Sequence, residues 1–513
     1  MRTKRSIYNT LAAAFLQLVN MVVSFILPRL ITQQYGSAMS GLVNSTRTTI
    51  SYFTIVEAGL MGAAIYALYK PLADKDDRRT SAIVSAANRY YNISGFFFSA
   101  LVLATTFLYP LFVTDKSISP FAVGALVAII GASGAMEFFL VGKYKVLFTA
   151  DQRSYVISLI NAVGVVVNAV ILLGMMRFHF DMVVVQLAAL AGFLLRSGLY
   201  AAFGRHAYRH LDFRAEPDNR ALDKRWDSFF LQVLGLVTSA TPLVVVTFAN
   251  GLVEANVYAY YNMVFLAVSA LLSTFNNGLS AMFGDMLAKD ELPALQRAYS
   301  QYEYLYYALL GWGYACAAML IMPFMGIYTR GITDAAYMRP LLGLLFVLAG
   351  LTTNIKTPQG MLLLSAGLFR ETRVQSVIQA GINLAVSIWL APSLGIAGVL
   401  IGTIAANVYR CVDQIFFIPR MVTKLSPMAT IRRVGRMAVL SCVSVLPVLR
   451  FMDIRPATWG GWILWAVPTA LWALLVFAGG NLVMEPKHAH DILMRFRTAF
   501  ARGGGSGGKG EAR

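Results

Sequence analysis

The chain has 513 residues, of which 58% are hydrophobic and only 13% are charged, with a mean hydropathy of +0.62. Soluble globular proteins carry about 25% charged residues, so the composition excludes an ordinary soluble enzyme. It indicates an all-α, polytopic membrane protein, because helices satisfy their own backbone groups in lipid. The net charge of +18 is not taken as a sign of nucleic-acid binding, since the basic residues follow a membrane topology.

Apolar segments of membrane-spanning length follow one another along the whole chain. The first follows a short basic start, but it is too long for a signal-peptide core and no small-residue cleavage site follows it, so we expect an uncleaved helix. We predict about 14 transmembrane helices, over residues 7–33, 38–69, 88–113, 120–149, 155–176, 182–203, 227–250, 256–286, 301–327, 338–366, 373–391, 396–419, 434–451 and 459–482.

Most of the 43 basic residues lie in alternate loops between these helices. Loops rich in Lys and Arg stay in the cytoplasm, so this asymmetry predicts that both termini are cytoplasmic. The most basic loop, residues 205–225, is expected to face lipid headgroups, which explains the positive charge without nucleic acid.

The sequence repeats itself at an offset of about 213–218 residues, a sign of parallel internal repeats. Residues 15–24 match 230–239, and the paired positions include Gly36 with Gly251, Pro110 with Pro323 and Arg196 with Arg410. We predict two pseudo-symmetric six-helix lobes around a central cavity, plus two C-terminal helices. The predicted parts are an N-lobe (1–210), a basic cytoplasmic linker (211–226), a C-lobe (227–420), helices 13 and 14 (421–486) and a flexible cytoplasmic tail (487–513).

Eight charged residues lie inside the predicted helices, where each costs about 2.5–3.5 kcal/mol if it faces lipid. We therefore expect them to face one another or a wet cavity. They are Arg29, Arg47, Glu57, Glu137, Arg196, Lys356, Arg410 and Asp413. The balance is positive, which suits an anionic ligand, and the planar guanidinium of arginine suits phosphate.

The spacing of these charges leaves alternatives open. Arg410 and Asp413 are three residues apart on one helix and can pair with each other. Arg29, Arg196 and Arg410 can also extend toward the headgroups, whereas Arg47 lies too deep for this.

Two further charges mark the middle of predicted helices. Lys356 lies in the segment 352–360, where Pro358 removes a helix hydrogen bond. A broken polar segment at mid-membrane favours a binding site, although a proline kink packed in protein is the simpler alternative. Glu137 is nearly equivalent to Lys356 in the repeat, so we expect both to face the central cavity.

Other patterns favour structural interpretations. The tyrosine-rich segments 88–92 and 301–307 are expected to form an aromatic belt at the membrane interface. Cys316, Cys411 and Cys442 show no metal-binding spacing. The sequence contains no nucleotide-binding loop and no catalytic triad. We therefore expect a protein without a metal, an organic cofactor or enzymatic activity.

The segments "PRLITQQYGSAMSGLVNS", "EAGL" and "ALYKPLADKD" resemble the N-terminal signature of bacterial oligosaccharide flippases, which belong to the multidrug/oligosaccharidyl-lipid/polysaccharide exporter superfamily. The resemblance is sharpest over residues 28–76. It implies two lobes that form a V, and alternating access coupled to a proton or sodium gradient. The implied substrate is a polyprenyl-pyrophosphate-linked sugar repeat unit. By position, Arg29 and Arg47 match cationic residues of that family.

Our leading hypothesis is a lipid-linked oligosaccharide flippase of the bacterial plasma membrane, in contact with membrane lipids and with polysaccharide polymerases and glycosyltransferases as possible partners. Arg29, Arg47 and Lys356 would bind the diphosphate, with Arg196 and Arg410 on the cytoplasmic part of the path. Glu57, Glu137 and Asp413 would couple ions or hold the arginines. The alternatives are a multidrug and toxin extrusion antiporter, a lipid II flippase, a membrane glycosyltransferase or polymerase, and a non-transporting scaffold.

Overall fold

A computed structural model describes residues 2–57, 60–113, 117–213, 215–218, 240–274, 276, 279–368, 370–452 and 456–486. In these residues every regular element is a helix, which confirms the predicted all-α class. The chain divides into two compact units. Unit 1 contains residues 1–263, 331–336 and 380–402, and unit 2 contains residues 264–330, 337–379 and 403–513. The predicted lobe and linker boundaries stay a prediction.

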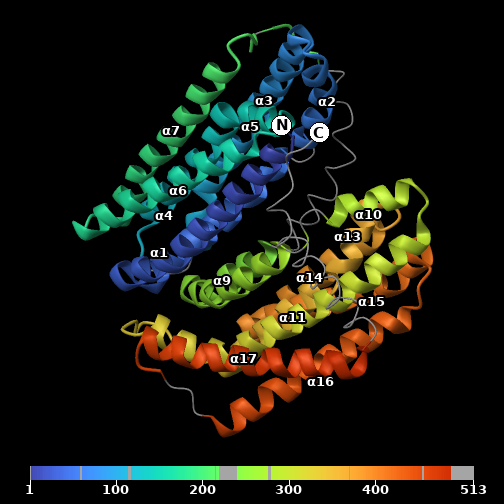
Figure 1. Ribbon diagram of the computed structural model, residues 1–513. Helices are drawn as coiled ribbons and strands as arrows, with labels where there is room; N and C mark the ends of the chain where they lie inside the picture. Colours follow the sequence, from blue (N-terminus) through green and yellow to red (C-terminus); the bar gives the residue numbers. More distant parts are fainter. Residues whose placement is uncertain are drawn as a thin grey trace, which may run out of the picture. The chain divides into compact units, whose positions relative to one another are not determined.

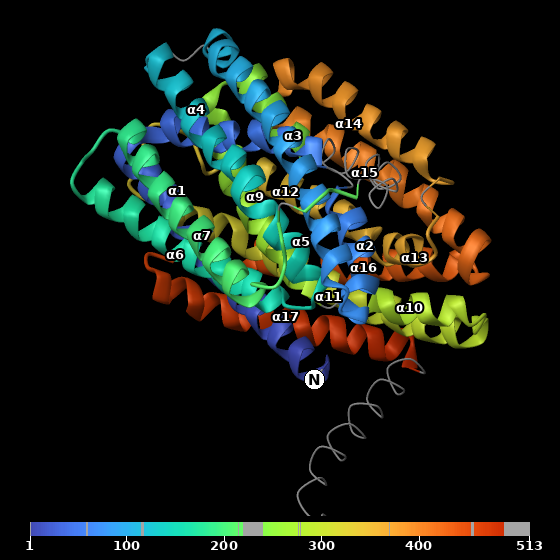
Figure 2. The same ribbon diagram turned by 90° about the horizontal axis from the view of Figure 1, so that it is seen from above.

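The helices of unit 1 come mainly from the first half of the chain. They are α1 (Arg2–Phe53), η1 (Thr54–Glu57), α2 (Leu60–Asp74), α3 (Asp77–Phe112), α4 (Pro120–Met136), η2 (Glu137–Val141), α5 (Gly142–Ala150), α6 (Ser154–Arg177) and α7 (Met182–Ala207), with the short helix Ala240–Asn250 and the first part of α9 (Leu252–Thr274). Helix α6 packs between α1 and α7, and α3 packs along α4 and α2 (Figure 1, Figure 2).

Unit 2 is built around the long helix α11 (Leu292–Tyr328), which packs against α12 (Pro340–Ile355), α16 (Pro427–Phe451) and α17 (Trp459–Met484). Its other elements are α10 (Leu279–Ala288), α13 (Thr357–Ser365), the start of α14 (Arg373–Leu394), the later part of α15 (Ile396–Ile418) and η4 (Pro419–Thr423). Helix α10 packs on α13. In the broken pair, α12 therefore packs against α11 and α13 against α10.

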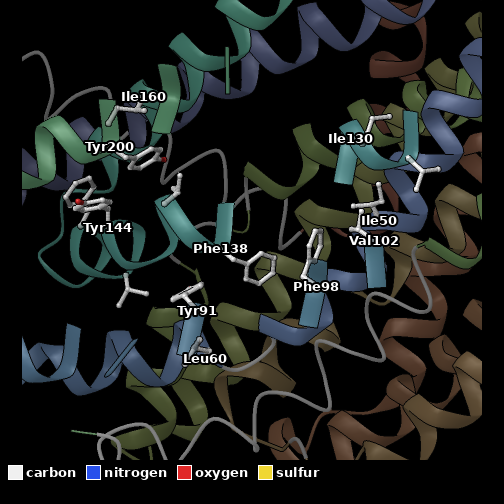
Figure 3. Close-up of a cluster of buried hydrophobic side chains, with 14 of the residues drawn as sticks. Ile50, Leu60, Tyr91, Phe98, Val102, Ile130, Phe138, Tyr144, Ile160 and Tyr200 are labelled. Atoms are coloured by element: carbon white, nitrogen blue, oxygen red, sulfur yellow. The ribbon is translucent and has the colours of Figure 1, made fainter. Parts of the chain in front are cut away.

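Large aromatic side chains fill the interior of unit 1 (Figure 3). The rings of Phe98 and Phe138 face each other with centroids 5.0 Å apart. Because lipid is as apolar as a helix face, such close packing rather than a hydrophobic driving force holds transmembrane helices together. Gly142 makes one such approach possible, since a Cβ there would lie 2.4 Å from the ring of Tyr91.

Eleven helices among the described residues are long and apolar enough to cross a membrane. One of them, Tyr8–Glu57, corresponds to the first predicted helix and most of the second. It bends at Gly36, whose φ of 83° and ψ of 166° interrupt the helix where the sequence predicts a boundary. Most of the predicted helix 227–250 lies outside the described residues. The count of 14 stays a prediction.

The backbone repeats as the sequence does. Residues with left-handed φ recur as Gly36 and Gly251, Lys75 and Asp290, Gln152 and Gly367, and His179 and Gly395. Three of these pairs are separated by 215 residues and the fourth by 216. Each pair stands at the same joint between equivalent helices, which confirms the two pseudo-symmetric repeats.

Candidate functional site

A cavity of about 300 Å³ lies inside unit 1, between α1, α4, α6 and α7. Its polar wall consists of Arg47, Ser133, Asn168, Gln186 and Arg196. These residues stand on four different helices, so the cavity depends on the bundle and not on one element. The charged residues among the described residues of this wall are Arg47 and Arg196, both positive.

Arg47 projects from α1 into this cavity. The side chain is exposed there, although the neighbouring Ser45 and Thr46 are buried. Ser45 accepts a hydrogen bond from the Tyr109 hydroxyl at 2.8 Å, which fixes the orientation of this helix face. No described residue forms an ion pair or a hydrogen bond with Arg47. Arg47 thus forms part of the cavity wall, and its role in binding a substrate stays a prediction.

Gln186 adds a second unused donor to the cavity wall. The residue is only 3% exposed, yet its Nε2 has no partner among the described residues. A buried amide without a partner costs about 1–3 kcal/mol. This donor points to a polar ligand or water in the cavity.

Arg196 extends from α7 to an acidic residue in a neighbouring helix. Its Nη2 pairs with Glu137, whose other carboxylate oxygen pairs with Lys145 of α5. Glu137 is the first residue of η2, a π-helical turn in which the regular backbone ladder is interrupted. Such turns occur frequently at functional sites. Arg196 thus has a protein partner as well as a place in the cavity wall.

Glu57 lies beside this cluster. It ends η1, and its Oε1 accepts a hydrogen bond from the Tyr91 hydroxyl at 3.1 Å. Lys145 and Glu137 lie close enough for their charges to interact with the Glu57 carboxylate. Arg47 and Glu57 form no ion pair in the described part of the chain, so the segment carries two separate charged positions.

The predicted helix break in unit 2 is present. Helix α12 ends at Ile355, and α13 begins at Thr357 with Pro358 in its first turn. Lys356 stands between them and donates to Asn407 Oδ1 at 2.5 Å. Lys356 and Glu137 thus occupy the break of the equivalent helix in each repeat. A common cavity for the two residues stays a prediction.

The carbonyl groups freed by this break are capped by tyrosines. The hydroxyls of Tyr306 and Tyr307 donate to Asn354 O at 3.3 Å and to Ile355 O at 3.1 Å. The interface-belt prediction for residues 301–307 is therefore wrong, since both tyrosines are only 1% exposed. They are buried because a broken membrane helix needs donors that lipid cannot supply.

Arg410 and Asp413 form the ion pair that their spacing allowed, at 2.5 Å. Arg410 is 4% exposed, so it does not extend to the headgroups. Arg29 is half-buried on α1, next to Pro28, whose carbonyl accepts from the Tyr260 hydroxyl at 3.0 Å. Substrate roles for Arg29 and Arg410 stay predictions.

Three charged residues that form ion pairs in the structure were not predicted from the sequence. Lys145 lies eight residues after Glu137, which is two helical turns and therefore the same face, and this spacing could have revealed it. Glu303 and Arg433 form a deeply buried ion pair at 2.7 Å between α11 and α16. Glu303 lies within the tyrosine-rich segment 301–307, which was assigned to the membrane interface. Arg433 lies one residue before the predicted helix 434–451.

No protein-family model and no curated protein matches the chain. Solved structures do match it. The lipid II flippase MurJ, in an inward closed conformation, aligns with a TM-score of 0.67 and 13% identity, over 93% of this chain and 98% of that one. An inward-facing multidrug resistance MATE family transporter of the MOP superfamily aligns with a TM-score of 0.64 and 13% identity, over 80% and 94%.

The chain has the fold of these transporters. A third structure extends the comparison, a MOP superfamily transporter from Pyrococcus furiosus that aligns with a TM-score of 0.57 and 13% identity, over 81% of this chain and 95% of that one. Its description reports a binding pocket of reverse polarity and suggests a different function. At such low identity the likeness shows the fold alone. The class of ligand has to be inferred from the charges in the cavity.

Proposed function

We propose that the protein is a flippase that moves polyprenyl-pyrophosphate-linked oligosaccharide units from the inner to the outer leaflet of the bacterial plasma membrane. It would work by alternating access, coupled to an ion gradient. One observation carries the proposal: Arg47 faces a cavity without a counter-charge among the described residues. A cation within a membrane-spanning helix is costly unless it is paired or solvated, and a phosphate group would supply a partner.

The chemistry of the cavity wall supports a phosphate rather than a cation. Arg47 and Arg196 are guanidinium groups, which bind phosphate oxygens through two parallel hydrogen bonds. Gln186, Asn168 and Ser133 offer neutral hydrogen bonds of the kind that sugars use. Arg29, Lys356 and Arg410 stay proposed parts of the cationic path, and a polymerase and glycosyltransferases stay proposed partners.

The test replaces Arg47 by alanine and by lysine in cells that depend on this protein for surface glycan export. We expect the alanine variant to lose export by about tenfold or more, the effect of losing about 1.4 kcal/mol of binding. The lysine variant should retain part of the export, because it keeps the charge but loses the planar fork. Arg177→Ala, which removes an exposed arginine at the end of α6, is the matched control. Normal export by Arg47→Ala at wild-type protein level would refute the proposal.

A lipid II flippase is the second candidate, because the MurJ structure aligns with 93% of the chain. The two substrates share a lipid diphosphate and differ in the sugars. Depleting the protein and identifying the lipid-linked intermediate that accumulates would separate them. Accumulated oligosaccharide supports our proposal, and accumulated lipid II supports the second candidate.

A further inference from the structure

Arg196 takes part in both the cavity wall and a neighbouring ion pair. It lines the cavity together with Arg47, and it pairs with Glu137 in a half-buried cluster of charges. Its Nε has no partner among the described residues, so the guanidinium is only partly used. A ligand in the cavity would therefore meet an arginine that is already held by a protein carboxylate.

We infer that Glu137 and the anionic ligand compete for Arg196, so that binding of the anion is accompanied by uptake of a proton at Glu137. This inference rests on the proposed function, since it assumes that the cavity receives the phosphate of the lipid-linked substrate. It adds a proton site, and it names Arg196 as the residue that links that site to the cavity.

The charge balance of the cluster gives the direction of the effect. Four charged groups meet here: Lys145 and Arg196 are positive, and Glu137 and Glu57 are negative, so the cluster is neutral. If a phosphate takes the charge of Arg196, the remaining three groups have a net charge of −1. An unbalanced charge in a half-buried cluster is less favourable than a balanced one, and one proton on a carboxylate restores neutrality.

The neighbours of Glu137 leave few other groups to absorb this change. Lys145 approaches from α5, Arg196 and Tyr200 from α7, Glu57 from η1 and Tyr91 from α3. The two tyrosines are neutral hydrogen-bonding groups, so they do not compensate a missing positive charge. Asn161 of α6, which accepts from the Tyr200 hydroxyl at 3.1 Å, is uncharged as well. The carboxylates are the groups that must take the proton.

The packing around Arg196 allows the side chain to serve both partners. A Cβ at Gly164 of α6 would lie 2.7 Å from Arg196 Cδ, so the missing side chain makes room for the arginine stem. The guanidinium lies over the ring of Phe193, with its Cζ 4.3 Å from the centroid. A stacked guanidinium keeps its edge free for hydrogen bonds, and a small rotation can change the anion that it meets.

The experiment measures anion binding to the full-length protein in lipid nanodiscs. The probe is methanedisulfonate, a diphosphate-shaped dianion whose sulfonates stay ionised in both mildly acidic and mildly alkaline buffer. We expect the wild-type protein to bind it more tightly at the acidic pH, by about fivefold or more. Glu137→Gln should bind it at least as tightly at either pH, with the pH dependence largely lost, because the amide no longer competes for Arg196.

Asp285→Asn is the matched control, since it neutralises an exposed carboxylate of α10 that pairs with Lys289. It should keep the wild-type pH dependence. Calorimetry of the wild-type protein in two buffers of different ionisation enthalpy provides a readout that needs no variant, and it should detect proton uptake on binding. Absence of proton uptake, or weaker binding by a folded Glu137→Gln protein, would overturn the inference.

The outcome also separates this inference from the proposed function. If the anion binds with proton uptake but lipid-linked oligosaccharide is not flipped, the proton site stands and the substrate is another anion. If oligosaccharide is flipped but anion binding takes up no proton, the proposed function stands and the linkage through Arg196 is wrong.

Discussion

The arginines of this protein differ in whether other residues partner their nitrogens, and Arg433 and Arg47 show the contrast. Arg433 of α16 has a full set: it donates to Glu303 at 2.7 Å, to Ser300 at 2.8 Å and to Glu485 at 3.3 Å. Arg47 has no partner in the described part of the chain. The first arrangement joins α16 to α11, and the second is the basis of the proposed phosphate site.

This contrast predicts the effect of removing Arg433. Arg433→Met should lower the free energy of unfolding by about 3–5 kcal/mol, because it leaves Glu303 charged and buried without its counter-charge. The double variant Glu303→Gln/Arg433→Met should recover most of this loss. Thermal unfolding of the purified variants checks both values. A double variant no more stable than Arg433→Met would show that the pair is not the cause.

At the scale of residues, the sequence predicted the rare charges but not their partners. The Arg410–Asp413 ion pair followed from its spacing of three residues. The contact of Arg196 with Glu137 joins residues 59 positions apart, and no local rule predicts which of several helices will be adjacent. Glu303 was missed because tyrosines suggested an interface, whereas buried tyrosines were needed as hydrogen-bond donors.

The irregular helical segments set the geometry at the scale of elements. The bend at Gly36 is held by Asp334, whose carboxylate oxygens accept from the Ser37 N–H and from the Ser37 hydroxyl, each at 2.6 Å. This is the capping pattern of a helix N-terminus, supplied by a residue remote in sequence. The hydrogen bonds to Asp334 thus hold the start of the second part of α1, which carries Arg47.

Replacing Gly36 by alanine should strain the backbone at the bend of α1. Its φ and ψ lie in a region that only glycine adopts readily, so Gly36→Ala should cost about 1–3 kcal/mol of unfolding free energy. Gly174→Ala is the matched control, because Gly174 is helical and its Cβ would meet nothing within 4 Å. The control should be neutral or slightly stabilising. Equal losses in the two variants would contradict the role of backbone strain.

The two mid-helix breaks differ in how far the sequence could predict them. Pro358 marks the break between α12 and α13, because it lacks an N–H group and cannot continue the ladder. The π-helical turn Glu137–Val141 has no proline or glycine within it. Phe138 packs on Phe98 and Glu137 pairs with Lys145 and Arg196 there, and such tertiary contacts leave no local signature in the sequence.

At the scale of the whole molecule, the sequence predicted the membrane class and the two repeats well. Helix boundaries were less accurate: α3 begins at Asp77, eleven residues before the predicted start at residue 88. Its first turns are polar and resemble a loop, yet the Asp76 carboxylate caps them by accepting from the Arg79 N–H at 2.9 Å. Hydropathy finds the part of a helix in lipid and overlooks its extension into water.

The loop charges predict the orientation of the whole chain. Reporter proteins fused to the C-terminus should be active only when they need the cytoplasm, because the positive residues keep both termini inside. A fluorescent protein should therefore fluoresce, and alkaline phosphatase should stay inactive. Fusion of the same reporters within residues 178–181, which join α6 to α7, provides the opposite control. Active phosphatase at the C-terminus would contradict the predicted topology.

The paired left-handed joints carry a consequence for the origin of the molecule. A half-length ancestor that assembled with its own copy would have placed one and the same residue at both mid-helix breaks. With the repeat offset of 215 residues, Glu137 is equivalent to Thr352 and Lys356 to Val141, so each charge stands in one repeat alone and the two repeats have diverged at their breaks. The two repeats keep the paired left-handed positions, which many sequences can form. Within one chain, the side chains of the two repeats no longer need to be identical. The two repeats thus share a backbone plan and differ in side-chain chemistry.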